Sequence, residues 1–209
     1  MDLFIYLFAA LFSVLNPIGT VPIFVGLTQD DSNIERNRIS LWTSINVFLI
    51  LTISFFVGQY ALSFFGISID ALRIAGGIVI LNSGFSLLSG KISKKRGINK
   101  KVENDAQKRN DIALTPLAIP MLAGPGSISL LIAFYQEHHQ PLEIFIAVLA
   151  ILCTSIVIFV ILKSAHYLSR FLGASGIVAI SRIIGFIVIA IGIQYIVSSI
   201  INIIKGNLM

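Results

Sequence analysis

The sequence predicts an all-α membrane protein. Its six transmembrane helices form two inverted three-helix repeats, with the first and fourth helices discontinuous at Gly/Pro breaks. Three observations lead to this fold class. The chain of 209 residues is 56% hydrophobic and only 12% charged, whereas a soluble domain carries roughly 25% charged residues. Its apolar stretches are long enough to cross a bilayer. Two of them are interrupted by Gly and Pro at corresponding places in the two halves of the chain.

The apolar stretches are separated by polar or turn-forming residues, which mark the ends of the spans. The first stretch begins without a positively charged region and without a small-residue cleavage site, so we expect a retained span and not a signal peptide. The predicted spans cover residues 3–27, 41–65, 67–90, 112–135, 142–163 and 174–204.

Basic residues are concentrated between the third and fourth spans and predict the orientation. Lys and Arg accumulate in cytoplasmic loops, so residues 91–110 are predicted to be a cytoplasmic loop within a single transmembrane domain. The loop would join repeat one (1–90) to repeat two (111–209), and both termini would lie outside the cytoplasm. Orientation in a lipid bilayer thus explains the pI of about 9.5, and no nucleic-acid partner is expected.

The two halves of the chain resemble each other in sequence. The segment 73–81 aligns with 182–190, which pairs Arg73 with Arg182 and Gly76 with Gly185. At nearly the same offset, the first Pro-containing break falls opposite the second. Because each half contains an odd number of predicted spans, the second half enters the membrane from the opposite side. This is the inverted-repeat architecture of many transporters.

The two breaks carry the functional prediction. Asn is a preferred N-cap and Pro is favoured at the first helical position, so each break predicts a half-helix that starts within the membrane. Two facing helix starts, with free N–H groups and partial positive charge, would bind an anionic group such as a carboxylate. The alternative is a pair of simple proline kinks, which transmembrane helices tolerate. The predicted substrate-binding residues are Asn16, Pro17, Gly19, Thr20, Gly124, Pro125, Gly126, Ser127 and Ser129.

Other polar residues in the spans have two interpretations each. Asn82 and Gln194 would line a solute path or form hydrogen bonds between helices. Arg73 and Arg182 would act as gate or anchor residues, or extend to the membrane interface. Charge is nearly absent from the predicted membrane centre, which favours a small neutral or zwitterionic solute.

No pattern in the sequence indicates a metal site, a cofactor or an enzyme. His138 and His139 are adjacent, point in different directions and are interpreted as solvated loop residues. No nucleophile–base set or phosphate-binding loop is present. Cys153 has no partner for a disulfide. A coupling ion, either sodium or a proton, remains open, as does the oligomeric state.

Two segments resemble the signature segments of the MarC family of bacterial integral membrane proteins. They are Leu15–Phe24 (LNPIGTVPIF) and Pro116–Ile128 (PLAIPMLAGPGSI), and the resemblance extends over essentially the whole chain. It implies a multi-pass protein of the bacterial plasma (inner) membrane. Some archaeal relatives transport glycine and alanine and have discontinuous first and fourth helices. The resemblance therefore implies a secondary transporter of small neutral amino acids or similar small solutes by alternating access. The alternative is a non-transporting membrane protein with a packing or partner-binding role.

Overall fold

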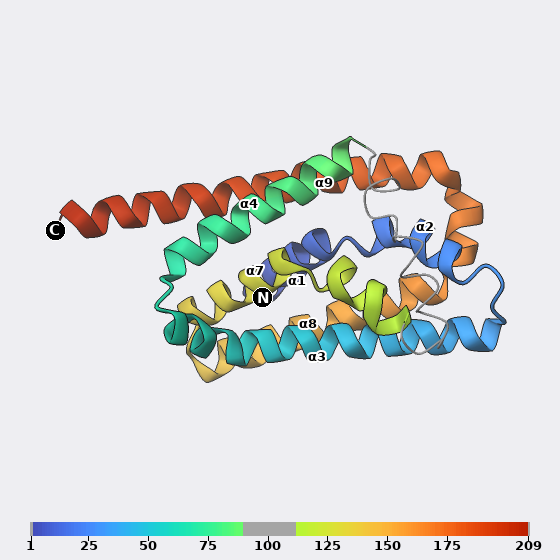
Figure 1. Ribbon diagram of the computed structural model, residues 1–209, viewed down its shortest axis with the longest axis horizontal. Coiled ribbons are helices and arrows are strands. Elements are labelled where there is room, and N and C mark those ends of the chain that lie inside the picture. Colours follow the sequence, from blue (N-terminus) through green and yellow to red (C-terminus); the bar gives the residue numbers. More distant parts are fainter. Residues whose placement is uncertain (1, 90–111, 209) are drawn as a thin grey trace.

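The computed structural model describes residues 2–89 and 112–208, and within them every regular element is a helix. The predicted basic loop, 91–110, lies outside the described residues. The elements are α1 (Asp2–Leu15), α2 (Pro17–Leu27), α3 (Asn33–Phe65), α4 (Ile69–Leu88), η1 (Ala113–Leu122), α7 (Pro125–Glu137), α8 (Pro141–Lys163) and α9 (Ala165–Leu208). Figure 1 shows these helices running roughly along the long axis of the molecule.

Within the described residues, five segments are long and apolar enough to cross a membrane. They are Asp2–Leu27, Asn33–Phe65, Ile69–Leu88, Pro141–Lys163 and Ser175–Lys205. The chain is therefore a multi-pass membrane protein. The predicted fourth span, 112–135, is divided between η1 and α7, which have 10 and 13 residues and are each too short to cross a bilayer alone.

The helix ends follow local capping chemistry. The sequence places the start of the second span at residue 41, but α3 begins at Asn33, because Ser32 and Glu35 form a reciprocal capping box. The same helix ends at Gly66, which adopts the left-handed conformation with φ of 64°. A second glycine with positive φ, Gly173, bends α9 between the predicted fifth and sixth spans.

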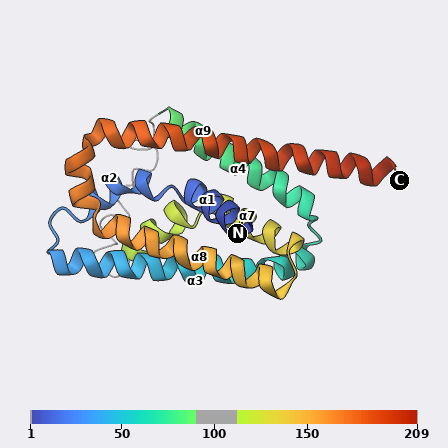
Figure 2. The same cartoon turned by 180° about the vertical axis from the view of Figure 1, so that it is seen from behind.

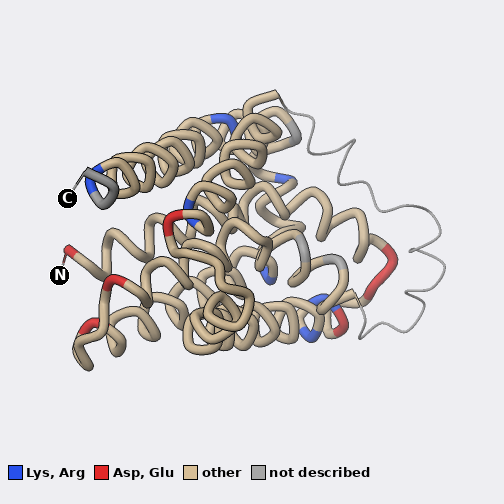
Figure 3. The backbone as a smooth tube through the Cα atoms, turned by 60° about the vertical axis from the view of Figure 1, so that its left-hand side comes forward, with Lys and Arg blue, Asp and Glu red and all other residues tan. Residues whose placement is uncertain are grey.

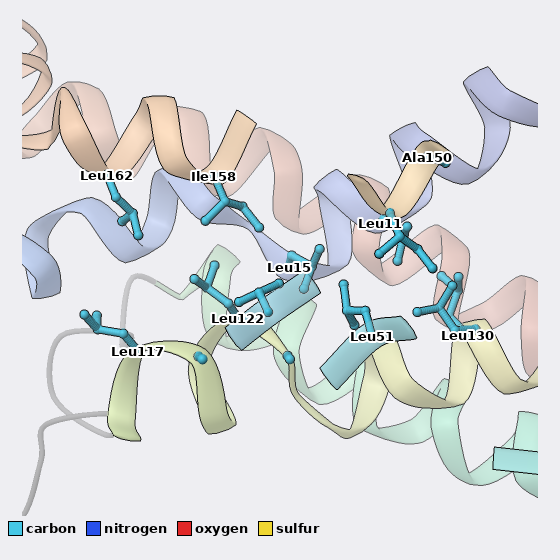
Figure 4. Packing of buried hydrophobic residues seen from close by; sticks show 14 of the residues in the cluster. Leu11, Leu15, Leu51, Leu117, Leu122, Leu130, Ala150, Ile158 and Leu162 are labelled. Atoms are coloured by element: carbon cyan, nitrogen blue, oxygen red, sulfur yellow. The ribbon is translucent and has the colours of Figure 1, made fainter. Parts of the chain in front are cut away.

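The helices form two outer pairs around a central group. α3 packs on α8 along one side, and α4 packs on α9 along the other. The view from behind shows α1, α2 and α7 between these pairs (Figure 2). Leu11, Leu15, Leu51, Leu122 and Leu130 are buried where the central helices meet α3 (Figure 4).

Glycines allow the backbones of α4 and α9 to approach closely. A Cβ atom added to Gly77 would lie 2.8 Å from the carbonyl oxygen of Gly192, and the reverse distance is also 2.8 Å. Gly84 and Gly185 stand in the same relation, with both distances at 3.0 Å. Such spacing leaves no room for a side chain, as is common where membrane helices pack through small residues.

Charged residues lie mainly toward the helix ends, as Figure 3 shows for Lys, Arg, Asp and Glu. Along the long axis the start of α1 lies near the middle of the molecule, whereas the end of α9 lies at one extreme (Figure 1). Long stretches between the helix ends carry no charged residue. This distribution suits a bilayer, in which charged groups lie at the interfaces.

Candidate functional site

The first break in the helices is centred on Asn16. α1 ends at Leu15 and α2 begins at Pro17, while Asn16 between them has φ 44° and ψ 62°. Its Oδ1 atom accepts a hydrogen bond from the N–H of Gly19 at 3.2 Å, and its carbonyl oxygen accepts one from the Thr20 hydroxyl at 3.3 Å. Asn is one of the few residues that adopts the left-handed conformation readily. The local sequence therefore both ends α1 and caps α2.

The second break is centred on Gly124, between η1 and α7. Ala123 and Gly124 leave the helical conformation, and α7 restarts at Pro125. The Ser127 hydroxyl donates to the carbonyl oxygen of Gly124 at 2.9 Å. No side chain caps this helix start.

The irregular form of η1 has a local cause. Thr115 and Ile119 have extended dihedral angles inside the element, and each precedes a proline in the sequence. A proline ring disfavours the α conformation of the residue before it. The i→i+5 hydrogen bond from Ala123 N–H to Ala118 O, at 2.8 Å, closes the segment before the break.

The two breaks lie near each other in the interior. A Cβ atom on Gly126 would be 3.5 Å from Cγ1 of Val14, which precedes Asn16 by two residues, and 2.9 Å from Cγ1 of Ile80. The predicted binding residues therefore belong to one region of the molecule. Gly124 is half-buried and Pro125 is exposed; the buried members are Asn16, Pro17, Gly19, Thr20, Gly126, Ser127 and Ser129.

One part of the predicted chemistry is wrong. Both helix starts were expected to present free N–H groups, but the N–H of Gly19 is occupied by the Asn16 side chain. The Thr20 and Ser127 hydroxyls also donate within their own helical turns. Short polar side chains form such local bonds readily at helix starts. Of the two helices α2 and α7, only α7 begins without a side-chain cap.

The other predicted residues do not gather at the breaks. Asn82 and Arg182 are exposed. Gln194 is also exposed and donates to the Ser198 hydroxyl at 3.0 Å within α9, so this bond does not join two helices. Arg73 is only 8% exposed and forms an ion pair with Glu137. It therefore does not extend freely to the membrane interface, and its sequence counterpart Arg182 has a different environment.

A polar cavity surrounds this ion pair. It has a volume of about 140 Å³ and is lined by Tyr6, Arg73, Glu137, Gln194, Tyr195 and Ser198. Sequence reasoning singled out Arg73 and Gln194 but missed the other four. Glu137 directly precedes the two loop histidines, and nothing in the local sequence shows which arginine a carboxylate will meet.

The opposite end of the molecule contains a second polar cluster, around His166. Its Nε2 atom lies 3.2 Å from the Thr28 hydroxyl, which itself donates to the carbonyl oxygen of Phe24 at 2.7 Å. Nε of Arg36 donates to the carbonyl oxygen of Thr28 at 2.9 Å. Burial, and then the Arg36 guanidinium, hold the pKa of His166 below its ordinary value.

No group of three or more His, Cys, Asp or Glu side chains that could hold a metal ion occurs in the described part of the chain. Of the two loop histidines, His138 has its Nδ1 atom 3.1 Å from the carbonyl oxygen of Phe134. The imidazole ring of His138 also stacks on the phenyl ring of Phe134. His138 is thus engaged with its own helix end.

Comparison with known proteins places this architecture in a family. The chain is 37% identical to the UPF0056 membrane protein YhcE of Escherichia coli K12, over 96% of this chain and 93% of that protein. It is 36% identical to the UPF0056 inner membrane protein MarC of Escherichia coli O157:H7, over 94% and 93% of the two chains. A UPF0056 membrane protein of Buchnera aphidicola subsp. Acyrthosiphon pisum is also 36% identical, over 100% and 96%.

No solved structure matches the chain. The model of the family described as "MarC family integral membrane protein" matches residues 1–204. With the curated relatives aligned along nearly its whole length, the chain belongs to the MarC family of integral membrane proteins.

Proposed function

We propose that this protein is a secondary transporter that carries a small neutral or zwitterionic solute, such as a small neutral amino acid, across the bacterial inner membrane. The observation that supports this most directly is the pair of helix starts at Pro17 and Pro125. Residues beside the two breaks, Val14 and Gly126, lie close together. Interrupted helices are tolerated at membrane depth where protein or a polar cavity covers the exposed backbone. A matched pair of them is typical of transporter binding sites.

The proposal includes six spans, of which η1 and α7 together make the fourth. The segment from Ala113 to Glu137 is long enough to cross a bilayer once its two short helices are taken as one path.

The glycine contacts between α4 and α9 support an inverted repeat. Gly185 and Gly192 follow Gly77 and Gly84 by 108 residues, the same separation as between Pro17 and Pro125. At this offset, Gly77 corresponds to Gly185 and Gly192 corresponds to Gly84. The contact of Gly77 with Gly192 therefore corresponds to the contact of Gly185 with Gly84, which is the other close contact observed. The segments that contain Arg73 and Arg182 align at a separation of 109 residues, which is one more than the separation of the glycines and prolines.

The helix contacts are reciprocal in the same way. α4 packs on α7 and α9 packs on α2; α3 packs on η1 and α8 packs on α1. These are the pairs expected if α1 and α2 correspond to η1 and α7, and if α3 and α4 correspond to α8 and α9. Two such halves could exchange conformations, which is the physical basis of alternating access.

The proposed substrate site lies between the two breaks. The uncapped first turn of α7 offers backbone N–H groups at Gly126 and Ser127, and the Asn16 side-chain amide offers N–H donors, because its Oδ1 atom makes the cap. Together with the positive end of the α7 dipole, these donors suit the carboxylate of a zwitterion. Transport would be coupled to sodium or to protons.

The decisive experiment measures uptake of radiolabelled glycine and alanine by liposomes that contain the purified protein, with sodium and proton gradients imposed separately. We expect accumulation under one gradient, which would identify the coupling ion. Pro17→Ala and Pro125→Ala should impair uptake, because they remove the residue that favours a helix start at each break. Pro141→Ala is the matched control, since Pro141 starts α8 on the exposed surface.

Full uptake by both break variants would contradict the proposed site. Folded protein that neither binds nor takes up these solutes would favour the alternative, a membrane protein whose kinked helices serve packing or the binding of a partner.

A further inference from the structure

Four helices converge on the polar cavity around Arg73. Tyr6 comes from α1, Arg73 from α4, Glu137 from the end of α7, and Gln194, Tyr195 and Ser198 from α9. We propose that this cavity is a binding vestibule for a small zwitterion, in which Arg73 binds the carboxylate and Glu137 binds the ammonium group. The inference deepens the proposed function and rests on it for the onward movement of the solute.

The charges of the cavity match those of a zwitterion. Arg73 and Glu137 form an ion pair in which the guanidinium side chain is 9% exposed and the carboxylate side chain is 53% exposed. A guanidinium group has five N–H donors, so one carboxylate partner leaves donors for a second. A zwitterion inserted between Arg73 and Glu137 would replace one ion pair by two. Its carboxylate would pair with the guanidinium group, and its ammonium group would pair with the Glu137 carboxylate. A purely cationic solute paired with Glu137 would leave the buried Arg73 side chain unpaired, which is costly.

The neutral groups of the cavity also fit this ligand. The Gln194 side chain uses an N–H donor for its bond to Ser198, which leaves its carbonyl oxygen available to accept from an ammonium group. The phenol groups of Tyr6 and Tyr195 both line the cavity and can donate or accept.

The size of the cavity indicates a small solute. Its volume is about 140 Å³, close to that of an engineered cavity of about 150 Å³ that binds benzene. Alanine has as many heavy atoms as benzene, and glycine has one fewer. Amino acids with long or aromatic side chains would exceed this volume in the conformation observed.

One helix interface connects the vestibule with the breaks. Along the contact of α4 with α7, Gly76 lies against Ser129, and Ile80 lies against Gly126 at the second break. Tyr6 and Asn16 are ten residues apart along α1, or about 15 Å at the rise of an α-helix. In this conformation the close contacts at Gly76 and Gly126 separate the vestibule from the breaks. A solute bound in the vestibule would therefore reach the breaks only after α4 and α7 move apart.

The test is equilibrium binding of radiolabelled alanine to the purified protein, with alaninamide and propionate as competitors that carry only one of the two charges. Glu137→Gln should weaken alanine binding by roughly 10- to 100-fold, as expected for the loss of a hydrogen bond to a charged group, and should leave competition by propionate. Arg73→Gln should abolish competition by propionate. The double variant Arg73→Glu with Glu137→Arg should restore part of the alanine binding, because the charges are exchanged but both are present.

Arg170→Gln is the matched control, since it removes an exposed arginine from α9 and should leave alanine binding unchanged. Melting temperatures in detergent report whether each variant is folded. If the buried Arg73 variant does not fold, the half-exposed Glu137 variant decides the question alone.

Uptake measured on the same preparations separates the two proposals. Uptake with alanine binding unaffected by Glu137→Gln would overturn the vestibule and leave transport standing. Weaker alanine binding by the Glu137→Gln variant, together with no uptake by the wild-type protein, would support the vestibule and contradict transport. Absence of both binding and uptake in the folded wild-type protein would overturn both.

Discussion

Asn16 is the only residue other than glycine that has a positive φ in the described part of the chain. Its side chain caps α2 through Gly19, and a Cβ atom on Gly19 would lie 2.2 Å from Nδ2 of Asn16. The Asn-Pro-x-Gly sequence is thus a single local device: Asn supplies the left-handed turn and the cap, Pro starts the helix, and Gly leaves room for the cap.

Replacement of Asn16 by Ala should destabilise the protein more than replacement by Gly. Asn16→Ala loses the cap and also the short polar side chain that lets Asn adopt the left-handed conformation, at a combined cost of about 2 kcal/mol. Asn16→Gly tolerates the backbone conformation and should cost only about a few tenths of a kcal/mol. Melting in detergent of the two variants measures the difference. Equal stabilities would show that the left-handed turn at position 16 carries no cost.

His166 should make the stability depend on pH. Its pKa in the folded protein lies below the ordinary value of 6.5, through burial and the nearby Arg36. The neutral ring is therefore favoured by folding: the full stability is present above pH 6.5 and is lost as the pH falls through the lower, folded-state pKa. We expect the melting temperature to fall between about pH 7.5 and pH 5.

His166→Gln should reduce this fall in melting temperature, because the remaining side chain does not titrate. His139→Gln, at an exposed loop position, should leave it unchanged. A pH profile identical in the wild-type protein and the His166 variant would contradict the assignment.

At the scale of helices, the most constrained contact is that of α4 with α9. The paired glycines at Gly77 with Gly192 and Gly84 with Gly185 bring one backbone against the other along both helices. Backbone atoms cannot move aside as the end of a side chain can. Substitutions there must separate the helices, whereas an exposed helical glycine has no such constraint.

Gly192→Ala should therefore destabilise the protein by about 1–3 kcal/mol, the usual cost of excess volume in a packed interface. The added Cβ atom would meet the Gly77 carbonyl oxygen at 2.8 Å and the Leu81 nitrogen at 3.0 Å. Gly26→Ala is the matched control: it lies in α2 with no atom within 4 Å of an added Cβ, and Ala favours a helix. Thermal or denaturant unfolding of both variants tests the expectation, and an unaffected Gly192 variant would show that α4 and α9 separate without cost.

At the scale of the whole molecule, the even number of proposed spans and the basic loop lead to one orientation. The six proposed spans would place both ends of the chain on one side of the membrane, and the turns at Gly66 and His138, which follow α3 and α7, on that same side. The positive charge in the sequence between residues 91 and 109 predicts that the opposite side is cytoplasmic.

Reporter fusions test this orientation in cells. Alkaline phosphatase, which is active only outside the cytoplasm, should be active when fused after Met209 and inactive when fused after residue 100. Green fluorescent protein should show the reverse pattern. Phosphatase activity at residue 100 alone would invert the orientation, and activity at both positions would contradict the three proposed spans between residue 100 and Met209.

Hydropathy was sufficient to predict that the chain is helical and that it crosses the membrane several times. These properties are readable because they are local: an apolar stretch of sufficient length, or an Asn-Pro step, acts through its immediate neighbours. The resemblance of the signature segments to the MarC family was confirmed for the same reason, since those residues are contiguous.

The three-dimensional arrangement alone decided which polar groups meet. Arg73 and Arg182 hold corresponding positions in sequence, yet the first is buried against Glu137 and the second is exposed. Side-chain direction and long-range pairing depend on how separate helices pack, and in a membrane protein that packing is set by close contacts such as those of Gly77 and Gly84.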